Sequence, residues 1–197
     1  MSVFQYDPPE RFVAGTVGQP GERTFFLQAS GGGRITSVVL EKTQVQALAE
    51  RIEELLEEVR RRFGEQADDT GATPEEVDDG PLQQPIEEDF RVGTLALAWD
   101  AETSRVIVEA QEVDESGEDA GGEGEDEVAE PEVFAEETPV DRDVLRVHLT
   151  PEAARAFAGR AMKVVAAGRP NCPLCGRPLD PAGHVCPRQN GYKPGAL

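Results

Sequence analysis

The segment VLRVHLTPEAARAFAGRAMKVVAAG, residues 144–168, holds a strand and a helix in direct succession. Residues 144–149 are rich in β-branched and apolar side chains, which favours a strand. Thr150 can accept hydrogen bonds from the free backbone N–H groups of a helix start, and Pro151 suits the first helical position. Apolar residues then recur at three- and four-residue spacing as far as Gly168, which predicts a helix ending there.

An earlier part of the chain has the same organisation. Residues 34–62 contain an apolar strand and then a helical stripe made of Val45, Leu48, Ile52, Leu55, Leu56 and Val59. Two further short apolar runs precede each strand-helix unit, and turn signals such as SGGGR (30–34) and DAETS (100–104) separate them. Short turns favour antiparallel pairing. We therefore predict an α+β fold in which two similar β-β-β-α halves form one antiparallel sheet of about six strands with two helices.

Charge divides the chain into segments. Residues 64–89 and 111–143 together carry a formal charge of −24, against −20 for all 197 residues, so the remainder is net positive by 4. These acidic stretches lack apolar periodicity, which indicates solvated spacers, although an acidic segment could also mask the basic part of the chain. We expect one domain over residues 1–168 with halves at about 1–63 and 89–168, an acidic linker at 64–88, an acidic disordered insert at 114–143, and a separate tail at 169–197.

The chain carries no sign of membrane insertion or export. No apolar run approaches the length of a membrane span, and the start MSVFQYDPPERF lacks the basic and apolar regions of a signal peptide. We therefore expect a cytoplasmic protein without membrane partners. Thiols stay reduced in that compartment, where clustered cysteines more often bind a metal than form disulfides.

The ligand pattern of the tail predicts a metal site. CPLCGRPLDPAGHVCPRQNGY (172–192) places four ligands in two close pairs: Cys172 and Cys175, then His184 and Cys186. A Cys-x-x-Cys turn lets two thiolates reach one ion, and residues two apart on an extended segment point to the same side. Three cysteines and one histidine are a standard ligand set for structural zinc, with one ion per chain and no coordination position left for a substrate. A redox dithiol at the first pair and unmetallated thiols are the alternatives.

Basic and aromatic residues surround these ligands. They can contact a protein partner, and they have the chemistry of a phosphate or single-strand contact; the alternative is an ordinary basic surface. The candidate partner-binding residues are Arg177, Arg188, Asn190, Tyr192 and Lys193.

Catalytic signatures are weak by comparison. His148 alternates with Val147 and Leu149, so we expect it on a solvated strand face rather than in a catalytic role. No local motif pairs a nucleophile with a base. If an active site exists, we expect it in a crevice between the halves near residues 6–11, in a pocket joining Asp7, Glu10, Arg11 and Arg23 with perturbed carboxylates.

Three long stretches carry a family resemblance: residues 6–29, 85–100 and 149–192. Together they resemble an uncharacterised actinobacterial family, a domain of unknown function with a C-terminal CPxCG…HxCPRxNGY motif. The resemblance covers nearly the whole chain outside the acidic stretches. It implies a cytoplasmic protein with a zinc knuckle at the four named ligands and no established activity.

Two main hypotheses and one further alternative follow. The first is a non-enzymatic binding or adaptor module that presents a zinc-stapled basic tail to an unknown protein. The second is an enzyme with an unrecognised site in the crevice between the halves. The third is a nucleic-acid-binding protein, for which affinity would depend steeply on salt.

Overall fold

The computed structural model describes residues 1–63, 78–113 and 142–168, together with the single positions 174 and 186. Seven strands and two helices are found in these residues, which supports the predicted α+β class. Their bounds are β1 Val3–Tyr6, β2 Arg11–Val17, β3 Thr24–Gly31, β4 Arg34–Leu40, α1 Lys42–Phe63, β5 Phe90–Asp100, β6 Arg105–Glu112, β7 Val144–Leu149 and α2 Pro151–Ala166.

All seven strands belong to one sheet in the order β1-β7-β6-β5-β4-β3-β2. Strands β2, β3 and β4 form one antiparallel meander that leads into α1, and β5, β6 and β7 form another that leads into α2. Glycines 32 and 33 turn β3 into β4 with positive φ angles of 59° and 75°, which residues without a β-carbon adopt without strain.

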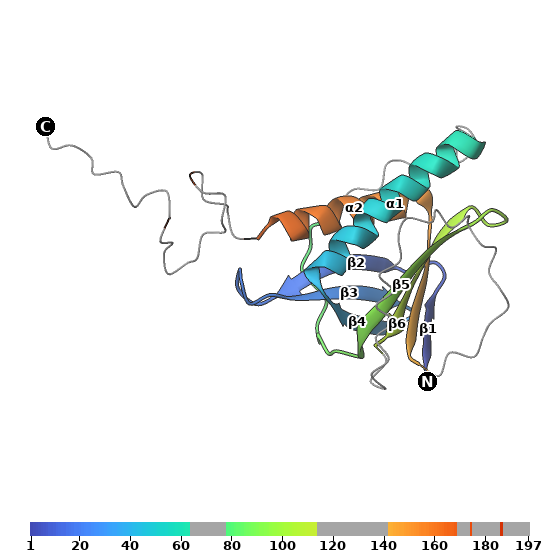
Figure 1. The fold of residues 1–197 in the computed structure, drawn as a ribbon. Coiled ribbons are helices and arrows are strands. Elements are labelled where there is room, and N and C mark those ends of the chain that lie inside the picture. The colour runs from blue at the N-terminus through green and yellow to red at the C-terminus, as the bar shows by residue number, and fades with distance from the viewer. Residues whose placement is uncertain (64–77, 114–141, 169–173, 175–185, 187–197) are drawn as a thin grey trace, which may run out of the picture.

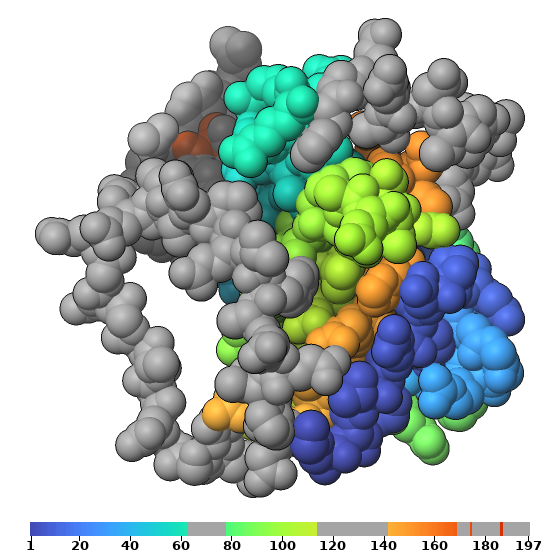
Figure 2. All heavy atoms as spheres, turned by 90° about the vertical axis from the view of Figure 1, so that its right-hand side faces the viewer, coloured from blue at the N-terminus to red at the C-terminus, as the bar shows by residue number. Residues whose placement is uncertain are grey.

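The predicted antiparallel sheet of about six strands is wrong in two respects. The sheet has a seventh strand, β1, and it is mixed, because β1 pairs with β7 in parallel and β4 pairs with β5 in parallel. A helix and a long segment connect β4 to β5, and a crossover of that length lets two neighbouring strands run in the same direction. Figure 2 shows β1, in dark blue, lying beside β7, in orange.

The sheet must be strongly curled. Strands β1 and β2 occupy its two edges, which six interstrand spacings would place about 29 Å apart in a flat sheet. The four residues 7–10 that join them span at most about 17 Å when extended. The described contacts agree with this curl: the Tyr6 hydroxyl of β1 lies 2.8 Å from Thr36 Oγ1 of β4, and β1 also contacts β3.

Both helices lie side by side on one face of this sheet (Figure 1). The predicted stripe of α1 is confirmed, since its residues pack into the main apolar core together with both meanders. The predicted start of α2 is also confirmed, because Thr150 caps the helix by accepting from the Ala153 N–H at 3.1 Å. Phe12 of β2 stacks on Phe157 of α2 with ring centroids 4.5 Å apart, so the core joins the first meander to the second helix.

Residues 78–89, named the strap here, run around the β2 edge and across the opposite face of the first meander. Leu82 is 8% exposed and packs with Val13, Phe26 and Val39. The Gln28 side chain holds the strap by accepting from the Gln83 N–H at 2.7 Å and donating to the Gln83 carbonyl at 3.0 Å. The sequence placed most of this segment in a solvated linker. The strap contains no helix or strand, but Leu82 at its centre packs against the sheet, where it fills the space above Gly15.

Gly15 lies in β2. A β-carbon built on it would lie 2.6 Å from the Leu82 side chain, so only glycine allows the strap to approach this closely. Asp89 attaches the end of the strap to β4, because its carboxylate accepts from the Ser37 N–H at 2.8 Å.

No helix in the described parts of the chain is long and apolar enough to cross a membrane. Residues 114–141 of the predicted insert, residues 64–77 of the predicted linker and nearly all of the predicted tail lie outside the described residues.

Candidate functional site

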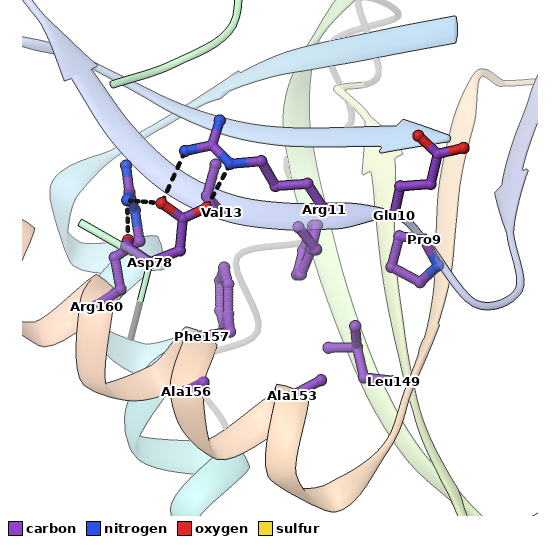
Figure 3. A pocket seen from close by; sticks show the side chains of 11 residues that line it. Pro9, Glu10, Arg11, Val13, Asp78, Leu149, Ala153, Ala156, Phe157 and Arg160 are labelled. Atoms are coloured by element: carbon purple, nitrogen blue, oxygen red, sulfur yellow. Dashed lines mark hydrogen bonds and ion pairs between the residues drawn. The ribbon is translucent and has the colours of Figure 1, made fainter. Parts of the chain in front are cut away.

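A groove runs between the edge strand β2 and helix α2 (Figure 3). Its cavity volume is about 100 Å³. Residues from the first meander, from the strap and from the α2 region all contribute to its walls, so it lies at the junction of the two parts of the sequence. The lining residues are Pro9, Glu10, Arg11, Phe12, Val13, Asp78, Leu149, Ala153, Ala156, Phe157 and Arg160.

Two arginines converge on Asp78 at one end of this groove. Arg11 of β2 binds the Asp78 carboxylate through Nε, and through Nη2 at 3.1 Å from Oδ1. Arg160 of α2 approaches from the helix side and binds the Asp78 backbone carbonyl through Nη1. Arg160 also donates to the Gly80 carbonyl at 2.7 Å and to the Ala14 carbonyl at 2.6 Å. These contacts fasten the beginning of the strap to both the edge strand and the helix.

The electrostatics of this cluster suit a structural ion pair. The hydrogen bond from Arg11 lowers the pKa of Asp78 to about 2, further assisted by the Gly80 N–H and by the charge of Arg160. Burial lowers the pKa of Arg160, and the neighbouring Arg11 charge acts in the same direction while Asp78 opposes it. Asp78 therefore stays ionised at neutral pH, whereas a general acid or base needs a pKa near the working pH.

The rest of the groove is apolar. Phe157, Leu149, Ala153 and Ala156 form its floor, and Phe157 is fixed by its stacking on Phe12. The helix presents small side chains next to β2, and these leave the cavity open. A volume of about 100 Å³ corresponds to roughly three water molecules of liquid, well below the several hundred Å³ of a typical small-molecule site.

The structure brings together only part of the predicted crevice. Glu10 and Arg11 line the groove as expected, whereas Asp7 and Arg23 do not. The sequence analysis missed Asp78 and Arg160, which make the closest polar contacts there. A signal for Arg160 existed in its place between Gly159 and Ala161 on the apolar side of α2, where arginine is unusual.

His148 is not the solvated residue that the sequence predicted. It does lie on the face opposite Val147 and Leu149, but its side chain is only 15% exposed. Its Nδ1 lies 3.9 Å from Asp7 Oδ2, and its Nε2 is buried without a hydrogen-bond partner. Alternation along a single strand does not reveal contacts of this kind with other segments.

The predicted metal site falls largely outside the described residues. Cys186 is described and is 4% exposed. The other three predicted ligands, Cys172, Cys175 and His184, and the predicted partner-binding residues Arg177, Arg188, Asn190, Tyr192 and Lys193, are not described. Within the described residues, no group of three or more His, Cys, Asp or Glu side chains could hold a metal ion.

Comparison with known proteins places the whole arrangement in one family. Residues 4–186 match the family described as "Protein of unknown function (DUF3090)". Neither the curated proteins nor the solved structures yielded a match. The matched range begins in β1, spans both meanders and both helices, and ends at Cys186. This chain therefore belongs to the DUF3090 family.

Proposed function

We propose that this protein is a zinc-binding, non-catalytic adaptor whose tail, residues 169–197, folds around one structural zinc ion. The ligands are Cys172, Cys175, His184 and Cys186. The observation that carries the proposal is the donor set itself, three cysteines and one histidine in two close pairs, together with the burial of Cys186 in a segment rich in proline, glycine and polar residues. A knuckle of this size has too few apolar residues to fold alone, so zinc binding supplies its folding free energy.

The groove supports an adaptor more than an enzyme. Its most perturbed carboxylate, Asp78, is held ionised by two arginines and fastens the strap. The cavity is also small for a substrate. The tail therefore carries the interaction, and we propose that Arg177, Arg188, Asn190, Tyr192 and Lys193 contact a protein partner.

Three finer proposals accompany this one. The two meander-helix units are similar halves of one repeat, supported by their common element order and by the match of Phe12, Gly15 and Thr16 to Phe90, Gly93 and Thr94. The protein works in the cytoplasm, supported by clustered cysteines whose spacing suits a metal rather than disulfides. The family resemblance further implies an actinobacterial source.

Metal analysis of the full chain tests the proposal. Protein purified without added zinc is expected to contain one zinc per chain, and Cys172→Ser and His184→Ala are expected to lose it. Because zinc orders only the tail, the thermal unfolding of the main domain should stay unchanged in both variants. A metal-free protein with a reversible Cys172–Cys175 disulfide would instead establish redox chemistry and overturn the proposal.

An enzyme remains the second candidate because one observation favours it. The groove lies between the two parts of the sequence and contains Glu10 and Arg11, as the crevice hypothesis requires. Glu10→Gln tests this candidate, since the Glu10 carboxylate lies on the rim and accepts from the Gly32 N–H at 3.0 Å without an ion-pair partner among the described residues. Nucleic-acid binding is tested by the salt dependence of retention on single-stranded DNA, which would be steep if phosphates were bound.

A further inference from the structure

We propose that the groove between β2 and α2 binds a short extended peptide segment with a small uncharged side chain. None of the proposed zinc ligands is among the described residues that line this groove, and the proposal does not depend on the tail. The proposal rests on the hydrogen-bonding groups at the β2 edge, the size and polarity of the groove floor, and the charges at its ends.

The edge of β2 offers backbone groups to a partner strand. Every residue of β2, from Arg11 to Val17, has a partner in β3, and the register is regular along the whole strand. Backbone groups of alternate residues point to opposite sides of a strand, and the Ala14 carbonyl points outward because it accepts from Arg160. Phe12, two residues earlier, therefore directs its N–H and C=O outward as well, along the wall of the groove. A donor and an acceptor in this arrangement match an extended main chain.

The floor of the groove accepts one small side chain. An extended peptide paired with Phe12 would direct alternate side chains toward Leu149, Ala153, Ala156 and Phe157. The cavity of about 100 Å³ is large enough for alanine, valine or threonine but too small for an aromatic ring.

The charges select an uncharged occupant. Four ionisable side chains line the groove, two acidic and two basic, and each already has a partner: Glu10 with the Gly32 N–H, and Arg11 and Arg160 with Asp78. A charged side chain over the apolar floor would lose its hydration, and the hydrogen bonds that these four groups already make would compete with any new ion pair.

Both ends of the groove limit the length of the occupant. At one end, the strap and Arg160 already cover the Ala14 carbonyl. At the other end stands Pro9, which has no backbone N–H to offer. Pairing is therefore confined to about two residues of the peptide. Such a contact is weak and reversible, as suits a transient adaptor.

The experiment titrates the full-length protein with capped peptides of the pattern Lys-Val-X-Val-Lys, in which X is Ala, Val, Asp or Trp. The readouts are the NMR signal and the hydrogen exchange of the Phe12 amide. We expect the Ala and Val peptides to shift this signal and slow its exchange, and the Asp and Trp peptides to bind at least about tenfold more weakly. The proposal is overturned if no peptide shifts the Phe12 signal at about 1 mM, or if the Trp peptide binds as well as the Ala peptide.

A matched pair of variants locates the site. Ala156→Trp fills the groove from its floor and should weaken binding of the Ala peptide at least about tenfold. Ala166→Trp places the same side chain at an exposed position of the same helix and should change the affinity for the Ala peptide less than about twofold. If Ala156→Trp does not fold, Ala153→Val gives a milder block. Equal affinities of the folded groove variant and Ala166→Trp would show that the peptide binds elsewhere.

Discussion

At the scale of single residues, Arg160 holds three parts of the molecule together. Its side chain is 7% exposed, and it donates to β2 through Ala14 and to the strap through Asp78 and Gly80. An edge strand with free carbonyls invites pairing with other chains, and a bound guanidinium removes part of that opportunity. The residue therefore stabilises the fold and also protects one edge of the sheet.

Replacing Arg160 with methionine removes these hydrogen bonds while keeping the aliphatic volume. The carbonyls of Ala14 and Gly80 then lose a buried donor, and we expect the free energy of unfolding to fall by about 3 kcal/mol. Urea unfolding measures this loss. Arg51→Met on α1 is the matched control, because the Arg51 side chain is 74% exposed and forms a surface ion pair with Glu54; its cost should stay within about 0.5 kcal/mol. Equal losses in the two variants would contradict the role of Arg160.

The lowered pKa of Asp78 predicts that the free energy of unfolding depends on pH. Its pKa is lowered from 3.8 to about 2 in the folded protein, so the folded state binds fewer protons than the unfolded state between these values. The stabilisation by the ionised Asp78 is complete above about pH 4 and is lost as the pH falls toward 2. Because the side chain is 40% exposed, solvent screening reduces it to about 1 kcal/mol.

The comparison of wild type with Asp78→Asn isolates this contribution from the other carboxyl groups. Wild type is expected to be the more stable protein at pH 6 by about 1 kcal/mol, and this difference should vanish between about pH 4 and pH 2 in urea unfolding. A difference that stays constant over this range would show that the carboxylate charge is not responsible.

At the scale of elements, the helices could be predicted from sequence and the strap could not. The stripe of α1 and the Thr150 cap of α2 are local signals, because helical periodicity and capping involve residues only three or four apart. The strap contributes one buried apolar side chain, Leu82, from a strongly acidic context, and a single leucine has no periodicity. In the sequence, the strap is indicated instead at Gly15 and Gln28. A glycine and a glutamine are unusual inside apolar strands, and both contact the strap.

Gly15 and Leu82 should be energetically coupled. Gly15→Ala forces the strap to move, since the new β-carbon would lie 2.6 Å from the Leu82 side chain, and we expect a loss of about 2 kcal/mol. Leu82→Ala leaves a void and costs about 2 kcal/mol on its own. In the double variant the two changes compensate, so its loss should be smaller than the sum by about 1 kcal/mol. Urea unfolding of the four proteins gives this coupling, and strict additivity would mean that the strap does not rest on Gly15.

At the scale of the whole molecule, residues 1–63 and 78–168 share one core. Phe12 stacks on Phe157, and β4 pairs with β5 through Val38–Phe90 and Val39–Arg91. The shared core could be predicted, because a single meander with one helix buries little apolar surface. The parallel pairs could not, because the direction of β1 depends on where β7 lies 141 residues later, as in the bond from Ser2 to Asp143. The groove could not be predicted for the same reason, because residues 9–13, Asp78 and residues 149–160 come together only in the folded chain.

A cut between residues 64 and 77 tests this sharing. A specific protease site inserted there can be cleaved without breaking any described contact. The two pieces should remain together in size-exclusion chromatography and unfold in one cooperative transition, because neither retains a complete core. Separation of the pieces, or two independent transitions, would show that each half has a core of its own.

The parallel pairing of β1 with β7 has a consequence for the order of events during synthesis. Strand β1 leaves the ribosome well before β7, the strand with which it pairs through Val3–Val144 to Tyr6–Val147. Until residue 147 emerges, β1 lacks its partner strand, and the nascent chain exposes the edges of an incomplete sheet. Sequence-distant pairing of this kind slows folding and lengthens exposure to aggregation. The chain can therefore complete its sheet only after β7 has been synthesised, when the cysteine-rich segment is the next part to follow.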